Sequence, residues 1–303
     1  MNPYTLTSGK LVRWREYLAL CKLRIVSAIV FTAIVGMFLA PGLASLSVVI
    51  FATLGIGLAA ASAAAVNHIV DQKVDAQMGR TKHRPLPRGQ VSTASAILFA
   101  FLLGAVSMVI LVVFVNALTA VLTLVSLIGY AFVYSWYLKR ATPQNIVIGG
   151  AAGAAPPVLG WTAVTGAVDP NALLLFLIIF AWTPPHFWAL AIYRRAEYAN
   201  VGIPMLPVTH GVAFTRLQIM LYTVILFVVS LLPFITYMSG PLYLIGALLL
   251  GVGFLSYALR MQWDHDERLA LKTFSYSILY LIGLFTFLLV DHYVPAMMTM
   301  LLS

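Results

Sequence analysis

Three oxygen-bearing side chains recur at a constant spacing where an apolar stretch of the chain becomes polar. Asn67, Asp71 and Asp75, here called the acidic ladder, are four residues apart, so on a helix they project from one face at intervals of about 6 Å. Carboxylates at the edge of an apolar segment are unfavourable unless they are paired or bind cations. Oxygen ligands of this kind suit Mg²⁺, which commonly bridges a few carboxylates to substrate phosphates. The spacing therefore predicts a magnesium site.

The residues directly after the acidic ladder carry the opposite charge. A proline-containing stretch, 79–89, here called the basic loop, contains Arg80, Lys82, Arg84 and Arg88. Their side chains are donors for phosphate oxygens, and carboxylates for a metal beside cations for an anion indicate a diphosphate site. The alternative is that Asp71 and Asp75 merely pair with Lys73 and the loop arginines at a solvated helix end. Lys73 is two residues from either aspartate, which places it off their face and favours a surface lysine.

The composition identifies the kind of protein that presents this site. Of the 303 residues, 62% are hydrophobic and 9% are charged, against about 45–50% and about 25% in an ordinary soluble domain. This excludes a soluble enzyme, a disordered protein and, despite the net charge of +9, a nucleic-acid-binding module. Apolar stretches long enough to cross a bilayer lie at about 24–41, 47–68, 94–115, 118–138, 144–163, 171–192, 215–238, 241–260 and 273–291. We therefore expect an all-α polytopic membrane protein with nine transmembrane helices.

The basic residues determine the expected orientation. With the N-terminus inside, all 18 lysines and arginines fall in inside segments, in accordance with the positive-inside rule. The long inside loops after the second and sixth spans are rich in charge, proline and glycine, so we expect the chemistry at the cytoplasmic face. The basic N-terminus runs into the first span without a small-residue cleavage site, which predicts no cleaved signal peptide.

A second set of polar residues lies in and after the sixth span. His186 follows two prolines, which are expected to bend the helix where it lines a cavity. An ionisable residue within a span indicates a functional site, and the alternative for this histidine is a structural hydrogen bond. Beyond it, Arg194, Arg195 and Glu197 indicate a loop that binds an anion, or else simple anchoring of the inside end.

Other residues carry less specific signals. An aromatic cluster near the end of the fourth span predicts an interfacial belt, with cation stabilisation by the rings as the alternative; its members are Tyr130, Tyr134, Trp136 and Tyr137. The roles of His68 and His83 stay open between cavity and packing. The single cysteine, Cys21, excludes a disulfide framework and a multi-cysteine metal site.

The motifs around these residues resemble those of a known family. The pattern Asn67-x-x-x-Asp71-x-x-x-Asp75, with Arg-Thr-Lys-His-Arg-Pro-Leu-Pro at 80–87, is similar to the first aspartate-rich motif of the intramembrane aromatic prenyltransferase (UbiA-type) superfamily. Trp-Thr-Pro-Pro-His-Phe-Trp at 182–188 and Gly-Ile-Pro-Met-Leu-Pro-Val at 202–208 resemble its protoheme IX farnesyltransferase (haem O synthase) branch. The resemblance covers essentially the whole chain and implies one transmembrane prenyltransferase domain, 1–303, as a UbiA-like helical bundle around a central cavity. The second aspartate-rich motif is reduced here to one carboxylate, Glu197, so a second metal site is not implied.

The resemblance also implies an activity. It implies transfer of a farnesyl group from farnesyl diphosphate to a vinyl group of haem B, giving haem O, by an enzyme of the bacterial inner (plasma) membrane with Mg²⁺ on Asn67, Asp71 and Asp75. The implied catalytic residues are these three with Arg80 and Lys82. The implied substrate-binding residues are Arg80, Lys82, Arg84, His186, Tyr193, Arg194, Arg195 and Glu197. Whether haem O then passes to a haem A synthase or directly to a terminal oxidase stays open.

Two other functions compete with this interpretation. One is a prenyltransferase of the same superfamily with another acceptor, such as a quinone precursor or a chlorophyll-like ring. The other is a transporter, against which the outer half of the predicted bundle offers no pathway of ionisable residues: only Asp169, Asp291 and His292 lie near that face.

Overall fold

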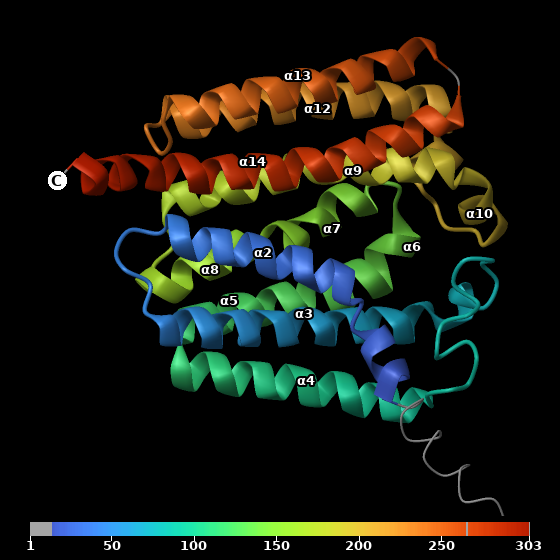
Figure 1. The fold of residues 1–303 in the computed structure, drawn as a ribbon. Coiled ribbons are helices and arrows are strands. Elements are labelled where there is room, and N and C mark those ends of the chain that lie inside the picture. Colours follow the sequence, from blue (N-terminus) through green and yellow to red (C-terminus); the bar gives the residue numbers. More distant parts are fainter. Residues whose placement is uncertain (1–13, 265, 303) are drawn as a thin grey trace, which may run out of the picture.

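The computed structural model describes residues 14–264 and 266–302, with side chains as far as Val294, and every regular element in this part of the chain is helical (Figure 1). The helices are Trp14–Leu20, α2 Leu23–Leu39, α3 Leu46–Asp75, α4 Thr93–Phe114, α5 Ala117–Ile128, the π-helix η1 Gly129–Leu138, α6 Lys139–Ala141, α7 Asn145–Ala154, α8 Pro156–Thr165, α9 Pro170–Tyr193, α10 Arg195–Asn200, α11 Leu206–Thr209, α12 Gly211–Ile235, α13 Pro241–Trp263 and α14 Glu267–Leu302.

The described chain holds eight to nine candidate spans, against the nine expected. Eight helical segments are long and apolar enough to cross a membrane, and the number is nine if the bent pair Trp14–Leu20 and α2, which meet at 54°, is counted as one span. The fourth span joins α5, η1 and α6, and the fifth joins α7 and α8. Sequence patterning missed the bend, because it lies at residues 21–22, before the first expected apolar stretch at 24–41. It missed the π-helix because that helix does not interrupt the apolar run of the fourth span.

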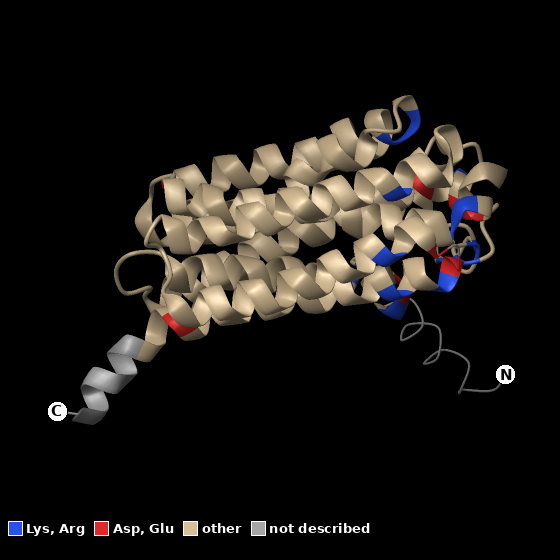
Figure 2. Ribbon diagram, turned by 90° about the horizontal axis from the view of Figure 1, so that it is seen from above, with Lys and Arg blue, Asp and Glu red and all other residues tan. Residues whose placement is uncertain are grey.

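The lysines and arginines of the described chain gather at one end of the bundle, as the loop pattern predicts (Figure 2). This end holds the connection after α3, the α9–α10 segment and the connection between α13 and α14 (Figure 1). Two carboxylates serve as helix caps instead: Asp169 Oδ1 accepts from the backbone N–H of Asn171 at the start of α9, and Asp291 accepts from that of Tyr243 in α13. Chemistry that needs charge is thereby confined to the basic end.

The sixth span differs from expectation at its two prolines. Pro184 and Pro185 lie inside α9, yet the helix continues without interruption from Pro170 to Tyr193. Proline removes a backbone hydrogen bond and normally kinks a helix, but α9 is packed tightly on α12, α14 and α7. The helix is therefore not interrupted beside His186, which is buried within it.

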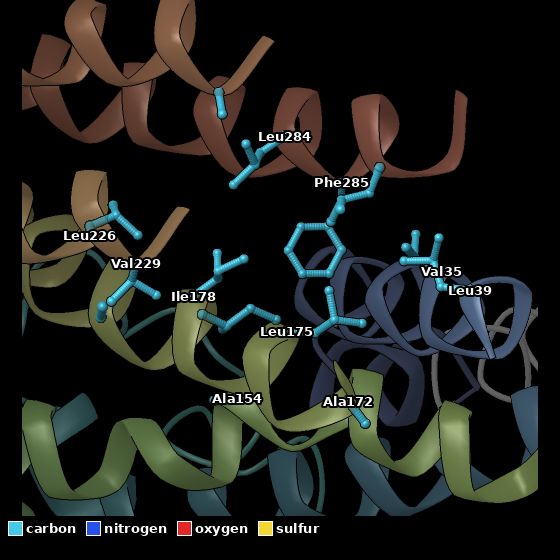
Figure 3. Close-up of a cluster of buried hydrophobic side chains, with 14 of the residues drawn as sticks. Val35, Leu39, Ala154, Ala172, Leu175, Ile178, Leu226, Val229, Leu284 and Phe285 are labelled. Carbon is cyan, nitrogen blue, oxygen red and sulfur yellow. The ribbon is translucent and has the colours of Figure 1, made fainter. Parts of the chain in front are cut away.

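A continuous apolar core lies between α9 and its neighbours (Figure 3). Leu175 and Ile178 of α9 meet Leu226 of α12 and the pair Leu284 and Phe285 of α14. These side chains are almost fully buried. Apolar side chains provide no driving force for association in lipid, so close packing must hold such helices together.

Close packing is most evident between α2 and α8. A Cβ atom built on Gly160 of α8 would lie 1.9 Å from the carbonyl oxygen of Ala33 in α2, and one on Gly36 of α2 would lie 2.1 Å from that of Pro157. Only hydrogen atoms fit at these two positions, so the helix backbones touch. Small residues allow this approach in membrane bundles, and here it fixes α2 and with it the preceding bend.

The glycine contact predicts a specific stability defect. Gly160→Ala should lower the free energy of unfolding by about 1–3 kcal/mol, because the added methyl group overpacks an interface with no space for it. Thermal unfolding of the purified protein in detergent measures this. Gly153→Ala is the matched control, since a Cβ there meets nothing within 4 Å. Equal stability of the two variants would show that α2 and α8 do not touch at this point.

Candidate active site

The acidic ladder lies on one face of a single helix, as its spacing predicts. The helix α3 continues past the apolar part of the chain to Asp75, and Asn67, Asp71 and Asp75 are only 3–4% exposed. Lys73 is exposed, which confirms that it lies off this face. Buried carboxylates at the end of a membrane span need nearby positive charge.

Three cations from three different segments provide that charge. Lys22 donates from its Nζ to Asn67 Oδ1, Lys139 Nζ lies 2.5 Å from Asp71 Oδ2, and Arg84 Nη1 lies 2.7 Å from Asp75 Oδ2. Lys22 occupies the break in the first span with a left-handed φ of 49°, and Lys139 directly follows η1. The sequence interpretation missed Lys22 and Lys139, whose only signal was their place among the inside-positive residues.

The π-helix brings further polar groups to the same place. Ser135 accepts from Asn67 Nδ2 at 3.1 Å and donates to the carbonyl oxygen of Tyr130 at 2.9 Å. Tyr130 and Tyr134 are half-buried and interact electrostatically with Asp71. π-Helical turns are frequent at functional sites. Their neighbours Trp136 and Tyr137 are 64% and 69% exposed, and the interfacial belt stays a prediction for the cluster.

The donor set fits one hard cation. It consists of two carboxylates and one amide, and the described chain holds no group of three or more His, Cys, Asp or Glu that could bind a metal. Asp71 Oδ1 is buried and has no hydrogen-bond partner, although a buried acceptor normally has one. Oxygen atoms of this kind are the ligands that Mg²⁺ prefers, and it usually completes its shell with water and substrate phosphate. The residues therefore fit Mg²⁺.

The basic loop is only partly free for an anion. Arg84 is engaged with Asp75, as in the alternative considered for the loop arginines, while Lys82, His83 and Arg88 are exposed. The hydroxyl of Thr81 donates to the Asp75 carbonyl oxygen at 3.0 Å and ties the loop to the helix end. His68, by contrast, is buried in α3, and both its ring nitrogens have no hydrogen-bond partner.

The loop after α9 faces the basic loop. Arg194 Nη1 lies 3.1 Å from Glu197 Oε1, while Tyr193 and Arg195 are exposed. Burial lowers the pKa of the Arg80 guanidinium, and the positive charge of Arg194 lowers it further. The two guanidinium groups are thus close enough to interact across two loops, and such a pair of positive charges is suited to an anion.

The histidine of the sixth span is packed between aromatic rings. The His186 ring stacks on Trp182 at a centroid distance of 4.1 Å and on Phe274 of α14 at 4.4 Å. Its Nδ1 lies 2.6 Å from Ser277 Oγ. Its described partners belong to α9 and α14, while those of the acidic ladder belong to other segments.

Some known proteins are similar to this chain in sequence, and others are similar to it in fold. The relatives include a protein of Methylococcus capsulatus, 63% identical over 93% of this chain and 95% of the relative, and one of Nitrosococcus oceani, 62% identical over 97% and 99%; both are named protoheme IX farnesyltransferase. A solved structure of digeranylgeranylglyceryl phosphate synthase has a TM-score of 0.78 at 17% identity, covering 92% of this chain and 98% of its own.

A second solved structure has the same fold and was determined with Mg²⁺ bound. A UbiA homologue from Archaeoglobus fulgidus bound to GPP and Mg²⁺ has a TM-score of 0.59 at 19% identity, covering 90% of this chain and 99% of its own. At this identity the likeness shows the fold alone. The model of the UbiA prenyltransferase family matches residues 29–289. With this match and relatives above 60% identity over nearly its whole length, the chain belongs to the UbiA prenyltransferase family.

Proposed function

We propose that the protein transfers a farnesyl group from farnesyl diphosphate to a vinyl group of haem B and so forms haem O. The names of the full-length relatives support this substrate pair. The observation that carries the proposal is the convergence of Lys22, Lys139 and Arg84 on the buried acidic ladder. Arg84 and Lys139 balance the two carboxylates, so the site carries no net negative charge, and a diphosphate is the anion that these basic groups and a carboxylate-bound metal would bind together.

The first half of the reaction breaks the bond between the farnesyl carbon and the diphosphate oxygen. Asn67, Asp71 and Asp75 would hold Mg²⁺, which supplies charge neutralisation to the departing diphosphate. Arg80 and Lys82 of the basic loop bind the outer oxygens of the diphosphate. Lys139, which is paired with Asp71, lies beside the metal-binding residues. The electron pair of the broken bond leaves with the diphosphate, and an allylic cation remains.

The second half forms the new carbon–carbon bond. The haem vinyl group donates its electron pair to the allylic cation, and water then adds to the resulting cation and releases a proton. The apolar interior of the bundle keeps water from the first cation. Tyr130 and Tyr134, half-buried beside the acidic ladder, place electron-rich rings where positive charge develops.

In this proposal haem B, the acceptor, binds beside His186 and the segment that follows α9. His186 provides an imidazole for the porphyrin, while Tyr193, Arg194, Arg195 and Glu197 lie at the basic end of the same helix or just beyond it, where the arginines bind the haem propionates. In this proposal the bundle lies in the plasma membrane of a bacterium, and the positive-inside rule supports a cytoplasmic location for its basic end. Both substrates then enter from the lipid bilayer.

Mass spectrometry of haem extracted from membranes with and without the protein tests the proposal. Haem O should accumulate only with it. Purified protein given farnesyl diphosphate with haem B and 4-hydroxybenzoate side by side should prenylate the haem alone. Prenylation of the benzoate instead would identify a different acceptor and overturn the proposal.

The metal role predicts a large loss of turnover from a small change. Asp71→Asn should lower kcat by about 100-fold or more, since one charge that holds the metal is lost. Asp169→Asn is the matched control, because asparagine caps a helix as well as aspartate does. Farnesyl transfer is measured on protein whose folding is verified by circular dichroism. Near-normal turnover of Asp71→Asn, or turnover that a chelator leaves unchanged, would contradict the role of the ladder.

The basic loop predicts a substrate-selective defect. Lys82→Gln should raise the KM for farnesyl diphosphate about tenfold, the equivalent of one charge-assisted hydrogen bond, and should leave the affinity for haem B unchanged. Lys73→Gln is the control, because this exposed lysine lies off the site. Steady-state kinetics with each substrate varied in turn gives both values. Equal damage toward both substrates would mean that the loop has only a structural role.

A further inference from the structure

The proton on the His186 ring can be located from its hydrogen bonds. Ser277 Oγ lies 2.6 Å from the carbonyl oxygen of Phe274 and 2.6 Å from His186 Nδ1. A serine hydroxyl has one hydrogen, and a carbonyl oxygen only accepts. The Ser277 hydrogen therefore points to Phe274, so the hydrogen of the second bond must come from Nδ1. A neutral imidazole with its proton on Nδ1 has a lone pair on Nε2.

Ser277 also bonds to Trp182, the residue whose ring stacks on His186. Trp182 Nε1 donates to the backbone carbonyl oxygen of Ser277 at 2.7 Å, and the Trp182 ring is stacked on His186 at an interplanar angle of 20°. Phe274 covers the other face at 26°. Both faces and the Nδ1 edge of the imidazole are thereby fixed by contacts between α9 and α14.

This arrangement is the one found around metal-binding histidines. Such a histidine almost always donates its second ring N–H to a fixed acceptor, which sets the tautomer and the ring orientation. We infer that Ser277 is a positioning residue that keeps the proton of His186 on Nδ1 and so leaves Nε2 as a ligand for the iron of the haem acceptor. The iron rests on the proposed function, whereas the tautomer is a property of the protein alone.

The tautomer is tested first, without haem. Nitrogen-15 NMR of the full chain in detergent micelles, labelled at histidine, distinguishes protonated from unprotonated ring nitrogens, and His186→Gln identifies the signal by its loss. We expect a protonated Nδ1 and an unprotonated Nε2 for His186 at neutral pH. Ser277→Ala should convert this into a mixture of tautomers. A proton on Nε2 in the unsubstituted protein would overturn the inference.

The ligand role is tested by titration with haem B, followed by absorption. Ser277→Ala should raise the Kd about tenfold, the lower end of the effect of losing such a partner, and should change the spectrum of the bound haem. Ser277→Thr keeps the hydroxyl and should restore both. Ser275→Ala is the matched control, since this exposed serine on the same helix bonds only to the carbonyl oxygen of Leu271.

The outcomes separate the two proposals. An unchanged Kd and spectrum in Ser277→Ala would overturn the positioning role of Ser277, and the same result in His186→Gln would overturn the ligand role of the histidine. Failure of the unsubstituted protein to convert haem B with farnesyl diphosphate would overturn the proposed function, and with it the identity of the ligand, whatever nitrogen carries the proton.

Discussion

Two carboxylates buried at the end of a membrane helix must be balanced by positive charge, and much of the basic end of this protein follows from that requirement. Asp71 and Asp75 have almost no exposed surface, so water cannot stabilise their charge. The compensating cations arrive from the bend of the first span, the end of the π-helix and the basic loop. The basic residues that contact the acidic ladder thus lie in irregular segments, whereas the regular helices of the bundle contribute close packing.

The two groups of polar residues are built differently. Around α3, Asp71 and Asp75 are balanced by Lys139 and Arg84, and charged groups are tolerated because they balance one another. Between α9 and α14, His186 is held by aromatic stacking and by a hydrogen bond to Ser277. Under the proposed function, the first group serves the charged leaving group and the second serves the porphyrin ring.

Much of the fold and part of the site could be predicted from the sequence. Spans follow from the length of apolar runs, and the face shared by Asn67, Asp71 and Asp75 follows from the helical period, because both are local properties. Lys22 and Lys139 could not be found, since their partners lie 45 and 68 residues away. The position of Tyr130 and Tyr134 beside the acidic ladder could not be predicted, because a π-helix turns side chains away from the positions that an α-helix would give them. The tautomer of His186 depends on a serine 91 residues later.

The left-handed backbone of Lys22 indicates what has been selected at this position. A residue with a Cβ atom is disfavoured there by roughly 1–2 kcal/mol, and glycine would adopt the same conformation without that penalty. A search for more stable variants would thus favour Lys22→Gly, yet the change would remove the ammonium group that contacts Asn67. Under the proposed function, stability and activity would thus impose opposite preferences on one residue, and a protein optimised for thermal resistance alone would lose the amine that contacts Asn67.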